Sequence, residues 1–409
     1  MRFYGGHDWG FSEHQLCVVD EAGTVLLNQK YPESRQGLGD LFEALQGFRR
    51  QGELVVCIEA IRGRIPERYH AEGLALCPVS PNALVPERNR YTTSRSKSDR
   101  QDALCLANLV RIDSARLDEV RPDSPETEIV RKLKAERDDL LSDRLRKRSK
   151  LEALLRQVFP ASIGLFADLD GAISRSFLSD FPSWKDAESL TVRRLRAWLK
   201  KHRYSGRQSA ESLLEACAEG AAGLVSDAEL ASCRRQVARM IDALDHVHGQ
   251  IKEVEAELAE ALKAHPDTAL FKSFPMVADL TAAGLISLFG DDRSRFSKAD
   301  GLAAISGVVP VTIASGKSHR VCFRRACNRS ARQTLVTFAQ LSKRQSEWAK
   351  KKYEQRREKG QRHPAATRAG ARDWLRVIYS CWKNRTLYDP TLHRAAVRLL
   401  EEAKTAAAG

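Results

Sequence analysis

The 409-residue sequence lacks the features that define several classes of protein. It has no apolar run near the roughly 20 residues that span a bilayer, and its first residues do not resemble a signal peptide. Its nine cysteines are scattered, odd in number and without a CxxC pair, which is typical of reduced thiols in a cytosol. We therefore predict a cytoplasmic protein without a membrane partner, a disulfide framework or an organic cofactor.

Acidic residues are scarce in one part of the chain. The formal net charge is +14, and residues 316–372 contain 17 lysines and arginines against 3 acidic residues. A concentrated positive segment is expected to bind polyanions such as nucleic acids. The net charge alone does not exclude a scattered, solvated basic surface.

Residues 1–110 alternate between strand and helix signals. A continuous apolar run at residues 54–58 is typical of a strand buried on both faces. A hairpin followed by strand–helix alternation predicts a mixed α/β sheet. We expect helices at residues 36–51 and ending near Tyr69, and strands at residues 2–8, 15–20, 24–27, 54–58 and 74–79.

Two long amphipathic helices are predicted in the middle of the chain, at residues 126–158 and 234–264. Several of their apolar positions repeat every seven residues, which fits antiparallel pairing or a dimer-forming coiled coil. Residues 159–229, between them, predict short helices without recognisable chemistry. Beyond them we expect a loop at residues 313–318 and helices at residues 278–289, 301–306, 330–352 and 371–382. We divide the chain into domains at residues 1–125, 126–265 and 266–409.

Four carboxylates lie where an RNase H-like nuclease core would need them. Asp8 ends the first predicted strand and Glu59 follows the buried one, so adjacent parallel strands would bring both to one sheet edge. Asp99 and Asp102 are spaced to share one face of a helix. Such a cluster suits Mg²⁺, with Mn²⁺ as an alternative, because hard cations prefer oxygen ligands. Taken singly, each acid also fits a turn, a strand end or a first helical turn.

The motifs around these acids form a set. They are Gly6-His7-Asp8-Trp9 with His14, Ile58-Glu59-Ala60, and Asp99 to Ala103 preceded by Lys97. In this order they resemble the DEDD-type, RuvC-like transposases of bacterial insertion sequences, the IS110 family, to which the Piv invertases are related. The resemblance implies an α/β RNase H-like (RuvC-like) N-terminal domain, a long helical coiled-coil middle and a mostly α-helical C-terminal transposase domain. It also implies that Asp8, Glu59, Asp99 and Asp102 are catalytic and hold the metal.

Ser315 precedes Gly316 in a basic loop. Arginines can mask phosphate charge and permit serine attack on a phosphodiester, but a serine beside glycine is also typical of an ordinary turn. The surroundings resemble the family's C-terminal pattern: Gly307-Val308-Val309-Pro310, then Ser315-Gly316, then Asn328 with Arg332. The resemblance implies that Ser315 is the nucleophile, with Ser306 and Ser318 as the nearest rivals. We assign nucleic-acid binding to Lys97, Lys317, Arg320, Arg324, Arg325, Asn328, Arg329 and Arg332.

Two positions depart from the family pattern. The family's Pro-Gly-Ile-Gly reads Pro275-Met276-Val277-Ala278 here, and Cys327 stands where the family has glycine before Asn328. The first departure puts in doubt a hairpin whose glycine amides would grip a phosphate. Neither departure touches the proposed chemical groups.

The resemblance implies a transposase that mobilises its own insertion sequence at the bacterial nucleoid. Its expected partners are the element ends, the target DNA, an element-encoded guide RNA, and copies of itself in a dimer or tetramer. Two other hypotheses stay open: a Holliday-junction-type nuclease that uses only the four acids and water, and a decayed, non-catalytic nucleic-acid-binding protein. Tyr91 and Tyr353 are candidates for stacking on bases.

Overall fold

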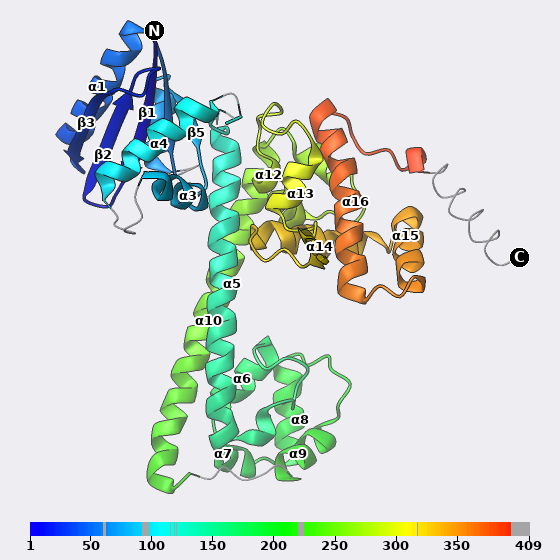
Figure 1. Ribbon diagram of the computed structural model, residues 1–409. Coiled ribbons are helices and arrows are strands. Elements are labelled where there is room, and N and C mark those ends of the chain that lie inside the picture. The colour runs from blue at the N-terminus through cyan, green and yellow to red at the C-terminus, as the bar shows by residue number, and fades with distance from the viewer. Residues whose placement is uncertain are drawn as a thin grey trace, which may run out of the picture. The chain divides into compact units, whose positions relative to one another are not determined.

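The computed structural model (Figure 1) describes residues 1–59, 63–91, 98–114, 116–117, 119, 121–219, 225–316 and 318–393. The chain forms two compact units, one of residues 1–124 with 290–298 and one of residues 125–289 with 299–409. No helix within the described ranges is long and apolar enough to cross a bilayer. The three-domain division drawn from the sequence stays a prediction, and Lys97 and Lys317 lie outside the described residues.

The first unit is built on a five-stranded sheet with the order β3-β2-β1-β4-β5. β2 runs antiparallel to β1 and β3, whereas β4 runs parallel to β1 and β5. The predicted mixed α/β sheet is therefore confirmed, with a strand at each predicted place. The strands are β1 (Arg2–Trp9), β2 (Glu13–Val19), β3 (Val25–Pro32), β4 (Glu53–Ile58) and β5 (Ala75–Pro78).

Helices cover both faces of this sheet, because alternate side chains of its strands are apolar on either side. α1 (Arg35–Gln51) and α2 (Arg64–Ala71) pack on the face that carries Phe3 and Leu16. α3 (Pro81–Tyr91) and α4 (Asp99–Asp113) contribute to the core on the opposite face, with Tyr4 and Cys17. The sheet is thus the buried middle layer of the unit.

Gly6 of β1 lets α4 approach the sheet very closely. A Cβ atom on Gly6 would lie 2.0 Å from the carbonyl oxygen of Ala103 and 2.4 Å from the amide nitrogen of Ala107. Real Cβ atoms do not come that close, so a residue with a side chain would force the helix outward. The absence of a side chain at Gly6 therefore sets the position of α4 over β1.

Two long antiparallel helices form the frame of the second unit, α5 (Pro125–Val158) and α10 (Asp227–Ala264) (Figure 1). Thr127 near the start of α5 hydrogen-bonds to His265 at the end of α10 (2.7 Å), and Arg137 donates to Glu255 (2.6 Å). Pairing within one chain is thus observed, whereas a dimer-forming coiled coil stays a prediction. The buried stripe of α10 consists of Val237, Ile241, Leu244, Val247, Ile251, Val254, Leu258 and Leu262.

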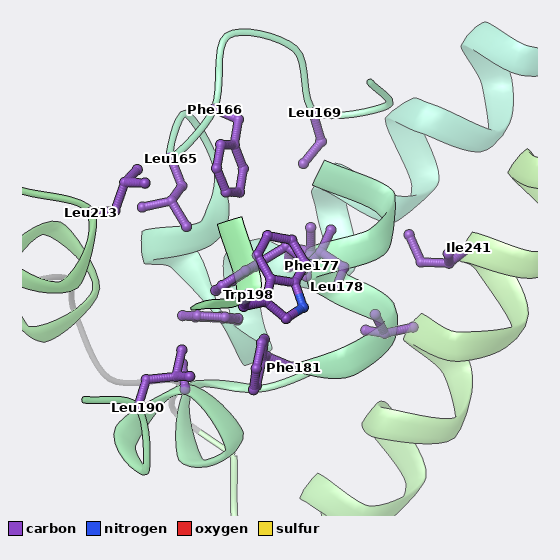
Figure 2. Close-up of a cluster of buried hydrophobic side chains, with 14 of the residues drawn as sticks. Leu165, Phe166, Leu169, Phe177, Leu178, Phe181, Leu190, Trp198, Leu213 and Ile241 are labelled. Atoms are coloured by element: carbon purple, nitrogen blue, oxygen red, sulfur yellow. The ribbon is translucent and has the colours of Figure 1, made fainter. Parts of the chain in front are cut away.

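The segment between these two helices packs around an apolar core that it shares with α5 and α10. Figure 2 shows Trp198 among Phe177 and Phe181, with Ile241 of α10 reaching the same cluster. The ring of Trp198 meets Phe177 edge-on at 5.6 Å, and its indole nitrogen donates to Asp180 at 2.7 Å. The segment consists of η1 (Pro160–Ser162), α6 (Ala172–Asp180), α7 (Trp184–Glu188), α8 (Val192–Lys201) and α9 (Ala210–Glu219).

The last part of the second unit is mostly helical, with one hairpin. Trp374 is buried at its centre, against the rings of Phe274, Phe338 and Trp348. The predicted helical character is therefore observed. The elements are α11 (Thr268–Lys272), α12 (Asp279–Phe289), α13 (Ala299–Ile305), β6 (Val311–Ser315), β7 (Ser318–Cys322), α14 (Arg329–Ser342), α15 (Glu347–Glu358), α16 (His363–Asn384) and η2 (Pro390–His393).

Two local predictions in this part are wrong. The sequence predicts a loop at residues 313–318, but β6 and β7 pair there as an antiparallel hairpin. The single helix expected at residues 330–352 is two helices, because the side chain of Ser346 caps a new start by accepting from the amide of Ala349. The new direction of α15 allows Trp348 to pack edge-on against Trp374.

Candidate functional site

Two of the predicted acids lie side by side on the sheet. The β1–β4 register pairs His7 with Ile58, so Asp8 and Glu59 follow on neighbouring parallel strands. Because side chains alternate along a strand, Asp8 shares the face of Gly6, which α4 covers. Glu59 likewise follows Cys57, whose side chain belongs to the core on that face. The β1–β4 register therefore brings Asp8 and Glu59 to neighbouring positions at one edge of the sheet.

α4 carries the other two acids near its N-terminus. Ser98 caps the helix by accepting from the amide of Gln101, and this places Asp99 and Asp102 in the first turn, where carboxylates are favourable. Asp102 is buried and Asp99 is exposed. The charge of Asp99 acts on Lys30 of β3 and helps to raise the pKa of that ammonium, after the larger effect of Glu13.

Asp102 is held by an arginine that no sequence pattern singles out. Arg88 of α3 donates two hydrogen bonds to the Asp102 carboxylate, one from Nε and one from Nη2. The distance from Nη2 to Oδ2 is 2.7 Å. The hydrogen bond to Asp102 is the main cause of a raised Arg88 pKa, and the charge of Glu59 contributes to the same shift. Arg88, Asp102 and Glu59 therefore form one electrostatic cluster.

The donor chemistry of the four acids suits a hard divalent cation, because all ligands would be carboxylate oxygens. The arrangement of the four acids fits a metal ion less well than their chemistry does. In the part of the chain that the structure describes, no three His, Cys, Asp or Glu side chains lie close enough together to hold a metal ion. The contact that opposes a closed site is the Arg88–Asp102 pair, since both Asp102 oxygens accept from Arg88.

A chain of hydrogen bonds supports β1 on the opposite face of the sheet. His7 is fully buried between the Tyr69 hydroxyl (2.9 Å) and the His14 ring (3.1 Å), and His14 meets Glu33 at 2.7 Å. With neutral rings the donors run in one direction, from Tyr69 to His7, then to His14, and then to Glu33. Burial, together with the neighbouring His14, lowers the pKa of His7 to about 3. The two histidines of the sequence motif are thus core groups that fix the strand of Asp8.

Ser315 lies at the tip of the β6–β7 hairpin. It pairs with Ser318, and the next residue, Gly316, has a φ of +53°. A positive φ at that position is typical of tight hairpin turns and favours glycine. Ser315 is exposed, whereas its rival Ser306 is buried and donates to the carbonyl of Leu302.

The hairpin register shows which of the nearby basic residues lie on the same face as Ser315. Arg320 pairs with Ile313, so it lies on the same face as Ser315, and His319 pairs with Ala314 on the other face. Arg325 and Arg329 are exposed, and Arg324 is partly buried. Asn328 caps α14, because its side-chain oxygen accepts from the amide of Ala331. Arg332 donates to the Arg324 carbonyl and lies over the ring of Phe323.

The structure draws attention to side chains that sequence reasoning missed. Arg88 does not belong to a recognisable sequence motif, and its partner Asp102 lies 14 residues further along the chain. Phe323 was overlooked in favour of Tyr353, whose hydroxyl instead meets the His363 ring at 2.7 Å while Lys343 covers its face. The available signal was an aromatic residue directly before Arg324 and Arg325 in the basic segment. The side chain of Tyr91 lies outside the described residues.

Met276 has a left-handed backbone conformation, which favours glycine, the residue that the family pattern has at this position. Its φ is +61°, one of three positive values among the described non-glycine residues. This left-handed conformation is costly for a residue with a Cβ. The turn after Pro275 therefore has a glycine-type geometry despite the departure from the family pattern.

Comparison with known proteins places the chain among transposases. Residues 6–160 match the DEDD transposase domain of the IS110 type, and residues 268–354 match the transposase IS116/IS110/IS902 family. A protein described as a putative transposase for the mini-circle IS117 of Streptomyces coelicolor is 29% identical over 98% of this chain and 99% of its own length. The uncharacterized 42 kDa protein of insertion element IS900 of Mycobacterium paratuberculosis is 24% identical, over 96% and 98%.

Among solved structures, T. thermophilus RuvC in complex with a Holliday junction substrate is 14% identical. It covers 29% of this chain and 100% of that chain with a TM-score of 0.22, which is too low to establish a shared fold. The two sequence matches include the four acids in the first and Ser315 in the second. They define an enzyme class, the insertion-sequence transposases, which cut and rejoin DNA. The chain belongs to the IS116/IS110/IS902 family of these transposases.

Proposed function

We propose that this transposase cuts and rejoins DNA through a covalent intermediate on Ser315. The observation that carries the proposal is the exposed serine at the hairpin tip, with Arg320 on the same face. A serine hydroxyl attacks a phosphodiester only when the phosphate charge is masked. Arg320 would supply that positive charge, and the exposed Arg325 and Arg329 would extend it along the following segment.

The proposed reaction is a pair of transesterifications. The Ser315 oxygen attacks phosphorus, the bond to the leaving sugar oxygen breaks, and a serine–phosphate ester forms. The proton that Ser315 loses is balanced by the proton that the leaving oxygen gains. A sugar hydroxyl of the second strand then attacks the same phosphorus and releases Ser315. The number of ester bonds is unchanged, so strands are exchanged without an external energy source.

We propose that Asp8, Glu59, Asp99 and Asp102 hold a divalent cation, Mg²⁺ or Mn²⁺, in an RNase H-like site. When bound, such an ion neutralises phosphate charge and stabilises the leaving oxygen. The adjacent strand positions of Asp8 and Glu59 support this assignment, and Arg88 must release Asp102 for that carboxylate to take part. Arg88 therefore neutralises the buried Asp102 carboxylate in the metal-free enzyme.

Metal-dependent thermal unfolding tests this role of Arg88. Arg88→Gln leaves Asp102 buried without a counter-charge, so it should unfold at a lower temperature than wild type and recover more upon addition of Mn²⁺. Asp102→Asn should lose most of the Mn²⁺ effect. The matched control is Arg90→Gln, which removes an arginine of the same helix that pairs with Glu87 instead. An equal Mn²⁺ effect in wild type and Asp102→Asn would exclude Asp102 as a ligand.

The choice of DNA sequence is a further part of the proposal. The lysines and arginines of residues 316–372 suit backbone phosphates, which carry no sequence information. We propose that an element-encoded guide RNA supplies that information by base pairing. Exchange between two duplexes also requires more than one active subunit, so we propose a dimer or tetramer that acts at the nucleoid.

The decisive experiment is trapping of a denaturant-resistant protein–DNA adduct. Purified full-length protein, Mg²⁺, co-purifying RNA and element-junction DNA should give an adduct with wild type and none with Ser315→Ala. Ser318→Ala is the matched control, because Ser318 pairs with Ser315 and is also exposed; it should keep the adduct. Cleavage by Ser315→Ala without any adduct would overturn the serine mechanism and favour a hydrolytic nuclease that uses only the acids and water.

A further inference from the structure

A pocket of about 350 Å³ lies in the second unit, beyond the base of the serine hairpin. Its walls are formed by α14 and the start of α16, and Phe323, the residue directly after β7, contributes its ring. The volume is near the lower end of the roughly 300–1,000 Å³ typical of ligand pockets. Its apolar walls include Val336, Leu341 and Pro364. We call it the Phe323 pocket.

Two arginines flank the aromatic ring of this pocket. The guanidinium carbon of Arg332 lies 4.4 Å from the Phe323 ring centroid, and that of Arg368 lies 4.7 Å from it. Both arginines line the pocket, and Phe323 is 46% exposed. An exposed ring with cations against it is the arrangement on which nucleobases stack in proteins that bind single strands.

The positive charge of the pocket is carried by these two arginines. Among the described residues, neither Arg332 nor Arg368 is ion-paired with a carboxylate, and Asp373 on α16 is held by Lys352 and Arg356 instead. The Nε of Arg332 is buried without a hydrogen-bond partner in the described structure. Burial and the neighbouring Arg332 both lower the pKa of Arg368. Two like charges held this close favour an anionic ligand.

The position of the pocket indicates which anion it would meet. Phe323 follows Ser318 by the length of β7, about 17 Å at strand spacing. That distance corresponds to about five nucleotide steps at the 3.4 Å spacing of one duplex strand. A DNA strand with its phosphate at Ser315 therefore has neighbouring nucleotides within reach of this pocket, and those nucleotides carry both an aromatic base and a phosphate.

We propose that the Phe323 pocket binds one unstacked nucleotide, with its base against Phe323 and its phosphate against Arg332 and Arg368. The assignment rests on the proposed function, in that a nucleic-acid strand lies along the hairpin. It adds a holding site for a base taken out of its stack, separate from the serine. The base comes from the DNA strand or from the guide RNA, and its chemistry is the same in both cases.

The test uses full-length protein and single-stranded oligonucleotides that contain one 2-aminopurine, as DNA and as RNA. A DNA with an abasic site at the same position shows what the base contributes. Wild type should change the 2-aminopurine fluorescence and bind the abasic DNA on the order of tenfold more weakly. Phe323→Ala should remove this preference for the base, whereas Phe323→Tyr should retain it. The stronger preference, for DNA or RNA, identifies the source of the base.

A separate experiment tests whether the arginine charge of the Phe323 pocket contributes to binding. Arg368→Gln should weaken binding of both oligonucleotides and lower the salt dependence by about one counterion. Arg376→Gln is the matched control, because Arg376 lies two turns further along α16, exposed and outside the pocket. It should bind like the wild type.

The outcomes separate the pocket from the proposed function. If Phe323→Ala binds nucleic acid and still prefers the base as wild type does, the pocket assignment is wrong and the serine mechanism is unaffected. If wild type binds neither oligonucleotide, the proposed function fails as well. Thermal unfolding of each variant shows whether it folds, and Phe323→Tyr and Arg368→Gln carry the test if Phe323→Ala does not.

Discussion

The two candidate catalytic regions are built in opposite ways. The acids lie on a sheet strand, directly after another strand and on the helix α4 packed against the sheet, and Asp102 is only 2% exposed. Ser315 stands on a two-stranded hairpin, whose Ile313 and Val321 are 55% and 63% exposed. The acid positions depend on the core behind them, whereas the serine depends on its turn and on the pairing of two short strands.

This difference predicts that substitutions in the two regions have different effects on stability and on chemistry. A packed core transmits any change in volume to the groups that it positions. A two-stranded hairpin is marginally stable alone and opens at lower free energy than a core strand. Substitutions within the sheet should therefore alter stability and the acid site together, while substitutions in the hairpin should alter chemistry with little effect on unfolding.

The largest effect is expected from Gly6→Ala. The new Cβ would collide with the backbone of Ala103, so α4 must move away from β1 and carry Asp99 and Asp102 with it. We expect a loss of unfolding free energy of about 1–3 kcal/mol or more, confined to the first unit, with loss of recombination. This loss is measured by denaturant unfolding, with hydrogen exchange of residues 2–9 as the probe.

Gly39→Ala is the control for this substitution. Gly39 lies in α1, and a Cβ added there would have no atom within 4 Å, so alanine should be neutral or stabilising by about 0.5–1 kcal/mol. A Gly6→Ala protein that unfolds like wild type would show that α4 does not depend on this close approach.

A second effect is expected from acid, and again in the first unit. The pKa of buried His7 is lowered to about 3, below the ordinary value of 6.5. Between these values the unfolded chain binds a proton that the folded chain does not. The contribution is therefore fully present above pH 6.5 and is lost as the pH falls towards 3, by about 1.4 kcal/mol per pH unit.

Hydrogen exchange of β1 measured from pH 4.5 to 6.5 checks this dependence. The slope should be steep in wild type and shallower in His7→Gln, which does not titrate there. His246→Gln, at an exposed histidine of α10, should keep the wild-type slope. An unchanged slope in His7→Gln would assign the acid sensitivity to other groups.

The smallest effect is a gain in the second unit. Met276→Gly relieves a residue held at a φ of +61°, and part of this gain is offset by the flexibility of glycine in the unfolded chain. We expect a stabilisation of up to about 1 kcal/mol, visible as a higher unfolding temperature of the second unit. Val277→Gly, at a neighbour without a positive φ, should instead destabilise it. Lower stability in Met276→Gly would mean that its side-chain packing outweighs the strain.

Much of the fold could be predicted because it depends on local patterns. The apolar run at residues 54–58 forms β4, and the stripe on residues 234–264 forms most of α10. Errors arose where two signals of similar strength compete. Helical periodicity continues across residues 342–346, but the cap at Ser346 and the packing of Trp348 against Trp374 start a new helix.

The candidate site, like the fold, has features that local sequence patterns predict and features that depend on long-range contacts. The order and spacing of Asp8, Glu59, Asp99, Asp102 and Ser315 are properties of the sequence, and they suffice to recognise the family. Strand register then places Asp8 beside Glu59. The partners of Asp102 and Phe323 are distant in the chain, so no local pattern predicts them.

The sequence by itself determined the strands of the first unit, the long helices, the chemical types of the site residues and the class of enzyme, because periodicity and motif spacing are local properties. Only the tertiary structure decided that Arg88 holds Asp102, that His7 and His14 belong to the core, and that two arginines lie against the ring of Phe323. Each of these contacts joins segments that meet only after burial of apolar surface has brought the elements together.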